Sequence, residues 1–143
     1  RSQRVAQNGT YNSNPVSAAA AITTLELVAD GSLHARANKA GDELRAGLSD
    51  AMKRVGVPGL CFGEASIFHV SFEGKPGLAG FDRPRRHDLY QMLRCALFNN
   101  GVDCASHHGW ISAVHTDTDI ERTVAGYEKA LRDMAADGSF KGM

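Results

Sequence analysis

The sequence predicts an α/β (α+β) fold in which helices pack on a short, mostly antiparallel sheet and one further helix precedes that sheet domain. Segments with apolar residues at helical spacing occupy both ends of the chain. The middle instead carries short runs in which apolar and polar residues alternate, as in strands with one buried face. The expected order is loop, helix, helix, strand, strand, helix, strand, strand, helix.

The chain should open with a loop and a helix. Residues 1–13 are polar and without periodicity, which is typical of a loop. Asn14 is a favoured N-cap, and Pro15 suits the first helical position because its missing N–H has no partner there. We expect this helix to reach about Ala29 and its small residues 18–21 to allow close approach by another element.

A second helix should run from about Ser32 to Val55, between a break at residues 30–32 and a stop at residues 56–59. Two strands follow, over Leu60–Phe62 and residues 66–73. The expected buried stripe of the helix is Leu33, Ala37, Ala40, Leu44, Leu48 and Met52, and the alternating apolar residues of the second strand are Phe68, Val70 and Phe72.

The remaining expected elements are a loop, a helix, two strands and a last helix. Residues 74–86 are rich in Gly and Pro and predict a loop, long enough to be a candidate functional segment. A third helix over 86–99 should bury Leu89, Met92, Leu93, Ala96 and Leu97 and end at the left-handed pair Asn100-Gly101. Strands are expected over 102–105 and 110–114, joined by residues 106–109. Thr116–Asp119 should cap a last helix with the stripe Ile120, Val124, Tyr127, Leu131 and Met134, and the tail 137–143 should fray.

Composition narrows the class of protein. A chain of 143 residues has the length of one domain, and 16 basic residues balance 16 acidic ones, so no nucleic-acid or membrane partner is favoured. Three cysteines, Cys61, Cys95 and Cys104, form no metal or disulfide pattern and should be reduced and mostly buried. We expect a cytoplasmic protein.

Few residues indicate chemistry. Gly9 and Thr10, in a loop ahead of a helix, suit hydrogen bonds to an anion, although an ordinary polar loop gives the same pattern. His107 and His108 suit pocket-lining polar residues, and a metal site formed with His115 is a weaker alternative, since adjacent strand residues point to opposite faces. We expect His115 to bond to local backbone. The basic patch Arg83, Arg85, Arg86 and His87 is either a solvated loop or a contact for a carboxylate.

Three collinear blocks carry a family resemblance. They are residues 9–15 (GTYNSNP) with the small-residue helix behind them, residues 63–68 (GEASIF), and residues 110–117 (WISAVHTD). Between about Gln7 and Met134 the chain resembles the C-terminal part of class III pyridoxal-phosphate aminotransferases, closest to the glutamate-1-semialdehyde 2,1-aminomutase branch.

The resemblance implies the small C-terminal domain of a fold-type I enzyme, with residues 1–30 ending the large cofactor domain and residues 31–143 forming the small domain. It implies that Gly9 and Thr10 bind the phosphate of pyridoxal 5'-phosphate across a homodimer interface. It also implies a substrate lid over an amino or keto compound, with contacts from residues 74–86 and from the turn that carries His107 and His108.

Two departures limit what the resemblance implies. The family's cofactor-anchoring lysine precedes the Gly-Thr block, so this segment contains no catalytic residue and should be inactive by itself. His107 stands where the aminomutase branch usually has an acidic residue, which leaves an ω- or β-amino-acid aminotransferase equally open. The alternative from another class is a stand-alone, non-catalytic binding module derived from such a domain.

Overall fold

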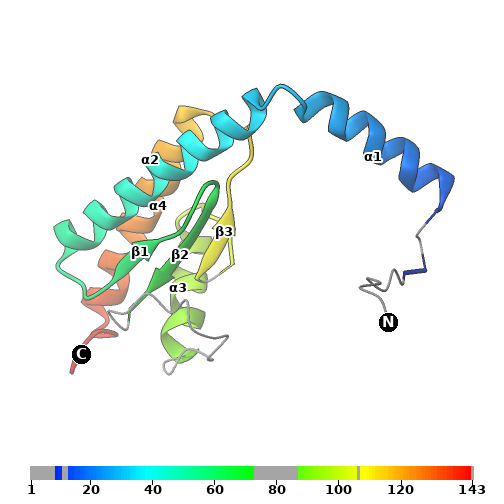
Figure 1. Cartoon of the computed structure of the whole chain (residues 1–143). Coiled ribbons are helices and arrows are strands. Elements are labelled where there is room, and N and C mark those ends of the chain that lie inside the picture. The colour runs from blue at the N-terminus through cyan, green and yellow to red at the C-terminus, as the bar shows by residue number, and fades with distance from the viewer. Residues whose placement is uncertain (1–8, 11–12, 73–86, 106, 143) are drawn as a thin grey trace, which may run out of the picture. The chain divides into compact units, whose positions relative to one another are not determined.

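The computed structural model describes residues 9–10, 13–72, 87–105 and 107–142. By its internal contacts the chain divides into two compact units, residues 1–32 and residues 33–143. The described elements are α1 (Pro15–Val28), α2 (Ser32–Val55), β1 (Leu60–Phe62), β2 (Ile67–Ser71), α3 (His87–Asn99), β3 (His108–Trp110) and α4 (Asp117–Ala136) (Figure 1).

The first unit consists mainly of α1. Its first turn is capped as expected, because the Asn14 side chain accepts from the backbone N–H groups of Val16 and Ser17 at 3.0 and 3.1 Å. No residue of α1 is buried, and apolar side chains point out all around it. Among the described residues no single helix is long and apolar enough to cross a membrane, and α1 and α2 meet that test only when counted together across their break.

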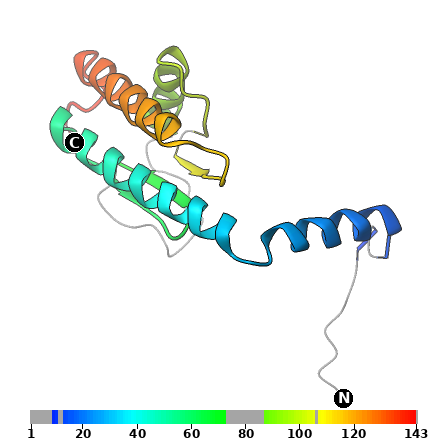
Figure 2. The same ribbon diagram turned by 90° about the horizontal axis from the view of Figure 1, so that it is seen from above.

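The second unit is a three-stranded antiparallel sheet in the order β1-β2-β3, with its core on one face. Phe68 and Val70 of β2 and Cys61 of β1 point into that core. In Figures 1 and 2, α3 and α4 lie beside one another on this side of the sheet, and the buried stripe of α2 completes the same cluster. The largest fully buried side chains are Leu44, Leu48, Leu89, Leu93, Leu97, Tyr127 and Leu131.

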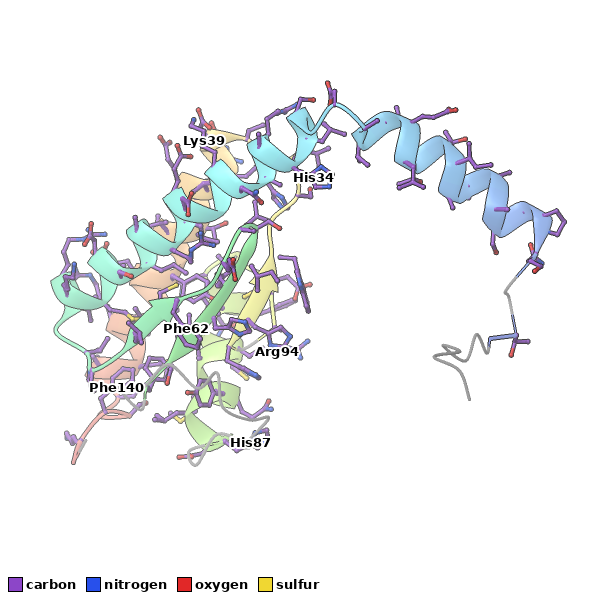
Figure 3. The ribbon with its side chains drawn as sticks, viewed as in Figure 1. His34, Lys39, Phe62, His87, Arg94 and Phe140 are labelled. Carbon is purple, nitrogen blue, oxygen red and sulfur yellow. The ribbon has the colours of Figure 1, made fainter. Side chains whose placement is uncertain are left out.

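All four expected helices are confirmed, but some expected buried positions are only half-buried: Leu33, Ala37, Ala96 and Val124. The capping box at the start of α4 forms between Thr116 and Asp119, and Gly101 ends α3 at a φ of 80°. Met92, expected in the core, is 41% exposed, and Tyr90 takes a buried place instead. The described part of the tail does not fray, since the ring centroids of Phe140 and Phe72 lie 5.2 Å apart. Phe140 is labelled in Figure 3.

The two later strands were predicted wrongly. Residues 102–105 form no strand, because the Val102 N–H donates to the Leu97 carbonyl at 2.9 Å and so completes the end of α3. The predicted strand over 110–114 lies instead at His108–Trp110, and its pairing ends where Ile111 donates to the Ser66 carbonyl. The expected loop 74–86 lies outside the described residues.

Helix α2 holds the turn between β1 and β2 in place. The Arg45 guanidinium donates to the carbonyls of Ala65 and Ile67, each at 2.7 Å, and also pairs with Asp42. Gly41 lets the turn come this close, because a Cβ there would lie 2.5 Å from the Ala65 carbonyl oxygen. The turn therefore has little freedom to move relative to α2.

Ala65 sits in this turn at a φ of 53°, a conformation that L-residues adopt at a cost. Replacing it by glycine, Ala65→Gly, should remove that cost and raise the free energy of unfolding by roughly 0.5–1 kcal/mol. Urea denaturation measures the change. The matched control is Ala135→Gly on the exposed side of α4, where glycine in a helical backbone should lower stability by a similar amount. Equal destabilisation by both variants would contradict the assigned strain.

Candidate functional site

The loop residues Gly9 and Thr10 are both exposed and lie just before α1. Because Asn14 already occupies the N–H groups of Val16 and Ser17, an anion near this helix end would have to bind mainly to the loop itself. Thr10 offers a hydroxyl and a backbone N–H for that purpose. Residues 1–8 and 11–12 lie outside the described part of the chain, so the sequence block around Thr10 is only partly described.

The face of the sheet opposite the core carries a row of rings. Phe62, His69 and His108 lie opposite one another on β1, β2 and β3. The ring of Phe62 stacks on that of His69 with centroids 5.2 Å apart, and His69 and His108 are separated by 6.0 Å. Trp110, two residues further along β3, meets His108 edge-on at 5.1 Å. Phe62 is labelled on β1 in Figure 3.

His107 lies beside this row, just before β3. Its ring contacts that of His108 at 4.7 Å and the buried Tyr90 of α3 at 5.4 Å. Its backbone carbonyl accepts from the Val70 N–H at 2.8 Å, which extends the pairing of β2 and β3 by one bond. The structure thus brings His107 and His108 together: Tyr90 contacts the ring of His107, and His69 lies beside that of His108.

Burial and neighbouring imidazoles shape the charge of this cluster. Burial lowers the pKa of His69, and the nearby His108 lowers it further. Burial likewise lowers the pKa of His107, with smaller contributions in the same direction from His108, His69 and His87. Both imidazoles are therefore mostly uncharged at neutral pH.

Sequence reasoning missed Phe62, His69 and Trp110. The alternation of Phe68 and Val70 already placed His69 on the other face of its strand, but the pairing of the three strands was needed to align it with His108. Because such pairing joins residues far apart in the chain, the sequence pattern within one segment does not predict it.

Two of the other predicted residues, His115 and His87, lie in the described part of the chain. As expected, His115 bonds to local backbone, where its Nδ1 accepts from the Ser112 N–H at 3.0 Å. His87 begins α3, and Arg83, Arg85 and Arg86 lie outside the described residues. No group of three or more His, Cys, Asp or Glu side chains within the described segments is placed to hold a metal ion.

The three cysteines are free, but only Cys61 is buried, whereas Cys104 is half-buried and Cys95 exposed, so the expectation of mostly buried thiols was wrong. Burial raises the pKa of the Cys61 thiol to about 12, which keeps it protonated and unreactive. Cys104 lies 3.3 Å from the hydroxyl of the fully buried Tyr127, a polar pair that the sequence did not indicate.

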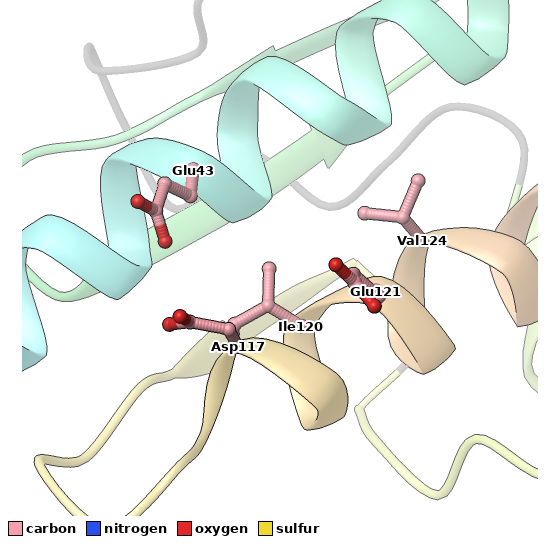
Figure 4. Close-up of a pocket in the computed structure, with 5 residues that line it drawn as sticks. All are labelled: Glu43, Asp117, Ile120, Glu121 and Val124. Atoms are coloured by element: carbon pink, nitrogen blue, oxygen red, sulfur yellow. The ribbon is translucent and has the colours of Figure 1, made fainter.

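A shallow hollow of about 350 Å³ separates α2 from α4 (Figure 4). Three carboxylates surround it, and a second hollow of about 280 Å³ beside it includes Lys39, which is paired with Glu43 at 3.1 Å. The residues lining the first hollow are Glu43, Asp117, Ile120, Glu121 and Val124. These groups are solvated or already paired, and they do not converge on a common point.

Two curated relatives resemble most of the chain. Glutamate-1-semialdehyde 2,1-aminomutase of Methanopyrus kandleri is 31% identical to it over a match covering 90% of this chain and 31% of the relative. The enzyme of the same name from Methanothermobacter thermautotrophicus is 32% identical, with coverages of 89% and 31%. The chain thus spans about a third of the length of the relatives it matches. No protein-family model matches it.

Solved structures agree with these relatives. A transaminase with pyridoxal phosphate bound superimposes with a TM-score of 0.78 at 26% identity, covering 94% of this chain and 31% of that one. An omega-transaminase from Sphaerobacter thermophilus gives a TM-score of 0.74 at 26% identity, with coverages of 92% and 31%. Helices on a small three-stranded antiparallel sheet match the small domain of the transaminase fold. The chain corresponds to the C-terminal part of pyridoxal-phosphate-dependent aminotransferases, with relatives named glutamate-1-semialdehyde 2,1-aminomutase.

The lowered pKa values of His69 and His107 predict a pH dependence of stability. Their neutral forms favour the folded state, so this contribution is complete above the unfolded pKa of about 6.5 and decreases as the pH falls below it. The free energy of unfolding should therefore fall between about pH 7 and about pH 5. Urea titrations of the protein at several pH values measure this dependence.

The variant His69→Gln should flatten that pH dependence. His34→Gln is the control, because His34 is exposed on α2 and makes no ring contact in the described row (both His34 and Phe62 are labelled in Figure 3). If the pH dependence of stability in His69→Gln were as steep as in the wild type, the assigned contribution of His69 would be wrong.

Proposed function

We propose that the chain is the C-terminal portion of a pyridoxal-phosphate-dependent aminotransferase or aminomutase that acts on an amino acid or on an amino ketone or aldehyde. The observation that carries the proposal is the match to glutamate-1-semialdehyde 2,1-aminomutases over 90% of this chain, together with the transaminase fold of its second unit. Within such an enzyme the second unit would form the substrate lid. The enzyme would act in the cytoplasm as a homodimer.

Thr10 would hold the cofactor's phosphate, with Gly9 allowing the backbone to approach it. The exposed hydroxyl and N–H of Thr10 are donors of the kind a phosphate needs, and Asn14 leaves the end of α1 with few free donors that could compete. We propose that this contact crosses to the neighbouring subunit. The cofactor supplies the electron sink for transfer of the amino group, and the chain supplies binding and orientation.

The described lysines do not suit the role of cofactor anchor. Such a lysine needs an amine that loses its proton near neutral pH, usually through burial. Hydrogen bonding and attraction from Glu43 instead raise the pKa of Lys39, and Lys53 is paired with Asp50 at 2.9 Å. All four described lysines are exposed: Lys39, Lys53, Lys129 and Lys141. We therefore propose that this segment is inactive by itself.

Helix α1 supports the proposal independently. A helix that is apolar on all sides belongs in the interior of a larger assembly. In α1, Val16, Ile22, Leu25 and Leu27 are all more than half exposed, and no residue is buried. Packing against a large domain or a second subunit would remove this apolar surface from water.

Replacing the phosphate donor tests the assignment of Thr10. In the protein that carries this chain, Thr10→Ala should weaken binding of pyridoxal phosphate by about 10- to 150-fold, the equivalent of roughly 1.5–3 kcal/mol for a hydrogen bond to a charged group. Thr10→Ser keeps the hydroxyl and should retain most of the affinity. Cofactor absorbance measures both. Unchanged affinity in Thr10→Ala would remove Thr10 from the site, and a protein with no cofactor affinity would favour the non-catalytic binding module.

The 143-residue segment and the longer protein that carries it should also differ in catalytic activity. Incubated with pyridoxal phosphate and an amino donor, the 143-residue chain should show no turnover, because its described lysines are exposed and paired or solvated. Intact-mass measurement after borohydride reduction detects any lysine that has reacted with the cofactor. Stoichiometric modification of one lysine would contradict the proposed inactivity.

A further inference from the structure

Ser13 has an unusual backbone conformation at the point where the loop meets α1. Its φ is 68°, in the left-handed region that residues other than glycine, asparagine and aspartate seldom adopt. The next residue, Asn14, returns to an extended conformation with a φ of −70° and a ψ of 124°, and it caps the helix. The chain therefore changes direction at Ser13, between the proposed phosphate ligand Thr10 and the first turn of α1.

The packing of the first unit does not account for this conformation. Ser13 is exposed and no residue of α1 is buried, so no core of described side chains holds the backbone in this shape. Strained backbone conformations cluster at active sites and ligand clamps, where the strain helps to organise the site. Because Ser13 follows Thr10 by three residues, the site to consider is the loop ahead of α1.

Every N–H group in the first turn of α1 already has a partner. Pro15 has no N–H, and the three residues after it donate to Asn14 with N···O distances of 3.0–3.1 Å: Val16, Ser17 and Ala18. A phosphate bound at this end of the helix would therefore take its hydrogen bonds from the loop. The backbone path of the loop then decides whether the donors of Thr10 can reach the phosphate.

We propose that Ser13 is a positioning residue for the phosphate of pyridoxal phosphate and acts through Thr10. Its left-handed backbone sets the direction in which the loop leaves the Asn14 cap, and so holds the hydroxyl and N–H of Thr10 toward the anion. The inference rests on the proposed function, which assigns the phosphate contact to Thr10. It goes further by naming the residue that gives the loop the conformation this contact needs.

Substitutions at Ser13 test the assignment in the protein that carries this chain, with pyridoxal phosphate and the phosphate-free pyridoxal as ligands. Ser13→Val introduces a β-branched residue, which is strongly disfavoured in left-handed backbone, and should weaken binding of pyridoxal phosphate by about tenfold. Ser13→Gly adopts the conformation without strain, and should bind as tightly as the wild type or up to about fivefold more tightly. Pyridoxal should bind equally to all three proteins. Cofactor absorbance measures each affinity.

Ala65→Val is the matched control, because Ala65 also has a left-handed backbone, with a φ of 53°, but lies in the second unit. It should lower stability in urea and leave the affinity for both ligands unchanged. Equal weakening of pyridoxal phosphate binding by Ser13→Val and Ala65→Val would overturn the proposal. Equal weakening of both ligands by Ser13→Val would do the same, because it would show a general loss of structure rather than a lost phosphate contact.

A double-mutant cycle with Thr10→Ala separates this inference from the proposed function. If Ser13 acts through Thr10, Ser13→Val should weaken binding by less than about twofold in a protein that already carries Thr10→Ala. The full loss in that background would overturn the positioning role. If Thr10→Ala weakens binding and Ser13→Val does not, this inference is wrong and the phosphate contact of Thr10 stands. If the wild type does not bind pyridoxal phosphate, the proposed function is wrong and the inference with it.

Discussion

Burial of one face of β2 is the constraint on which the rest of the second unit depends. Phe68 and Val70 are each 3% exposed, and they pack into a single core with the stripes of α2, α3 and α4. Side chains alternate along a strand, so a slip of one residue would turn both out of the core. The register is thereby fixed, and it sets Phe62, His69 and His108 opposite one another on the other face.

The turn at residues 63–66, which leads into β2, is held in place by α2. Arg45 bonds to the carbonyl of Ala65 in the turn and to that of Ile67 at the start of β2, and Gly41 gives the turn room against α2. The Arg45 side chain is itself largely buried, and hydrogen bonds from a charged group to backbone carbonyls contribute more than a surface ion pair does. The start of β2, and with it the position of His69, depends on this contact with α2.

The two units differ in where their stability comes from. In the second unit every helix buries an apolar stripe, whereas α1 buries nothing and is apolar all around. Most of the stability of a helix in a protein comes from such packing rather than from its own propensity. The N-cap at Asn14 and the start at Pro15 mark where α1 begins, and these local features are the ones that stabilise it within the described residues.

Charge gives the site its chemical character. Burial and neighbouring imidazoles lower the pKa values of His69 and His107, whereas hydrogen bonding to Glu43 raises the pKa of Lys39. Within the described residues the imidazoles of His69 and His107 are thus mostly uncharged, whereas all four lysines are exposed.

The sequence by itself determined the four helices, their caps and most of their buried stripes, because these depend on residues within a few positions of one another. It also determined the resemblance to the C-terminal part of the aminotransferases. Tertiary structure decided the position of the last strand, because pairing with β2 places it at His108–Trp110. It alone decided the ring row, because hydrogen bonds between distant strands, and not local pattern, set which side chains meet.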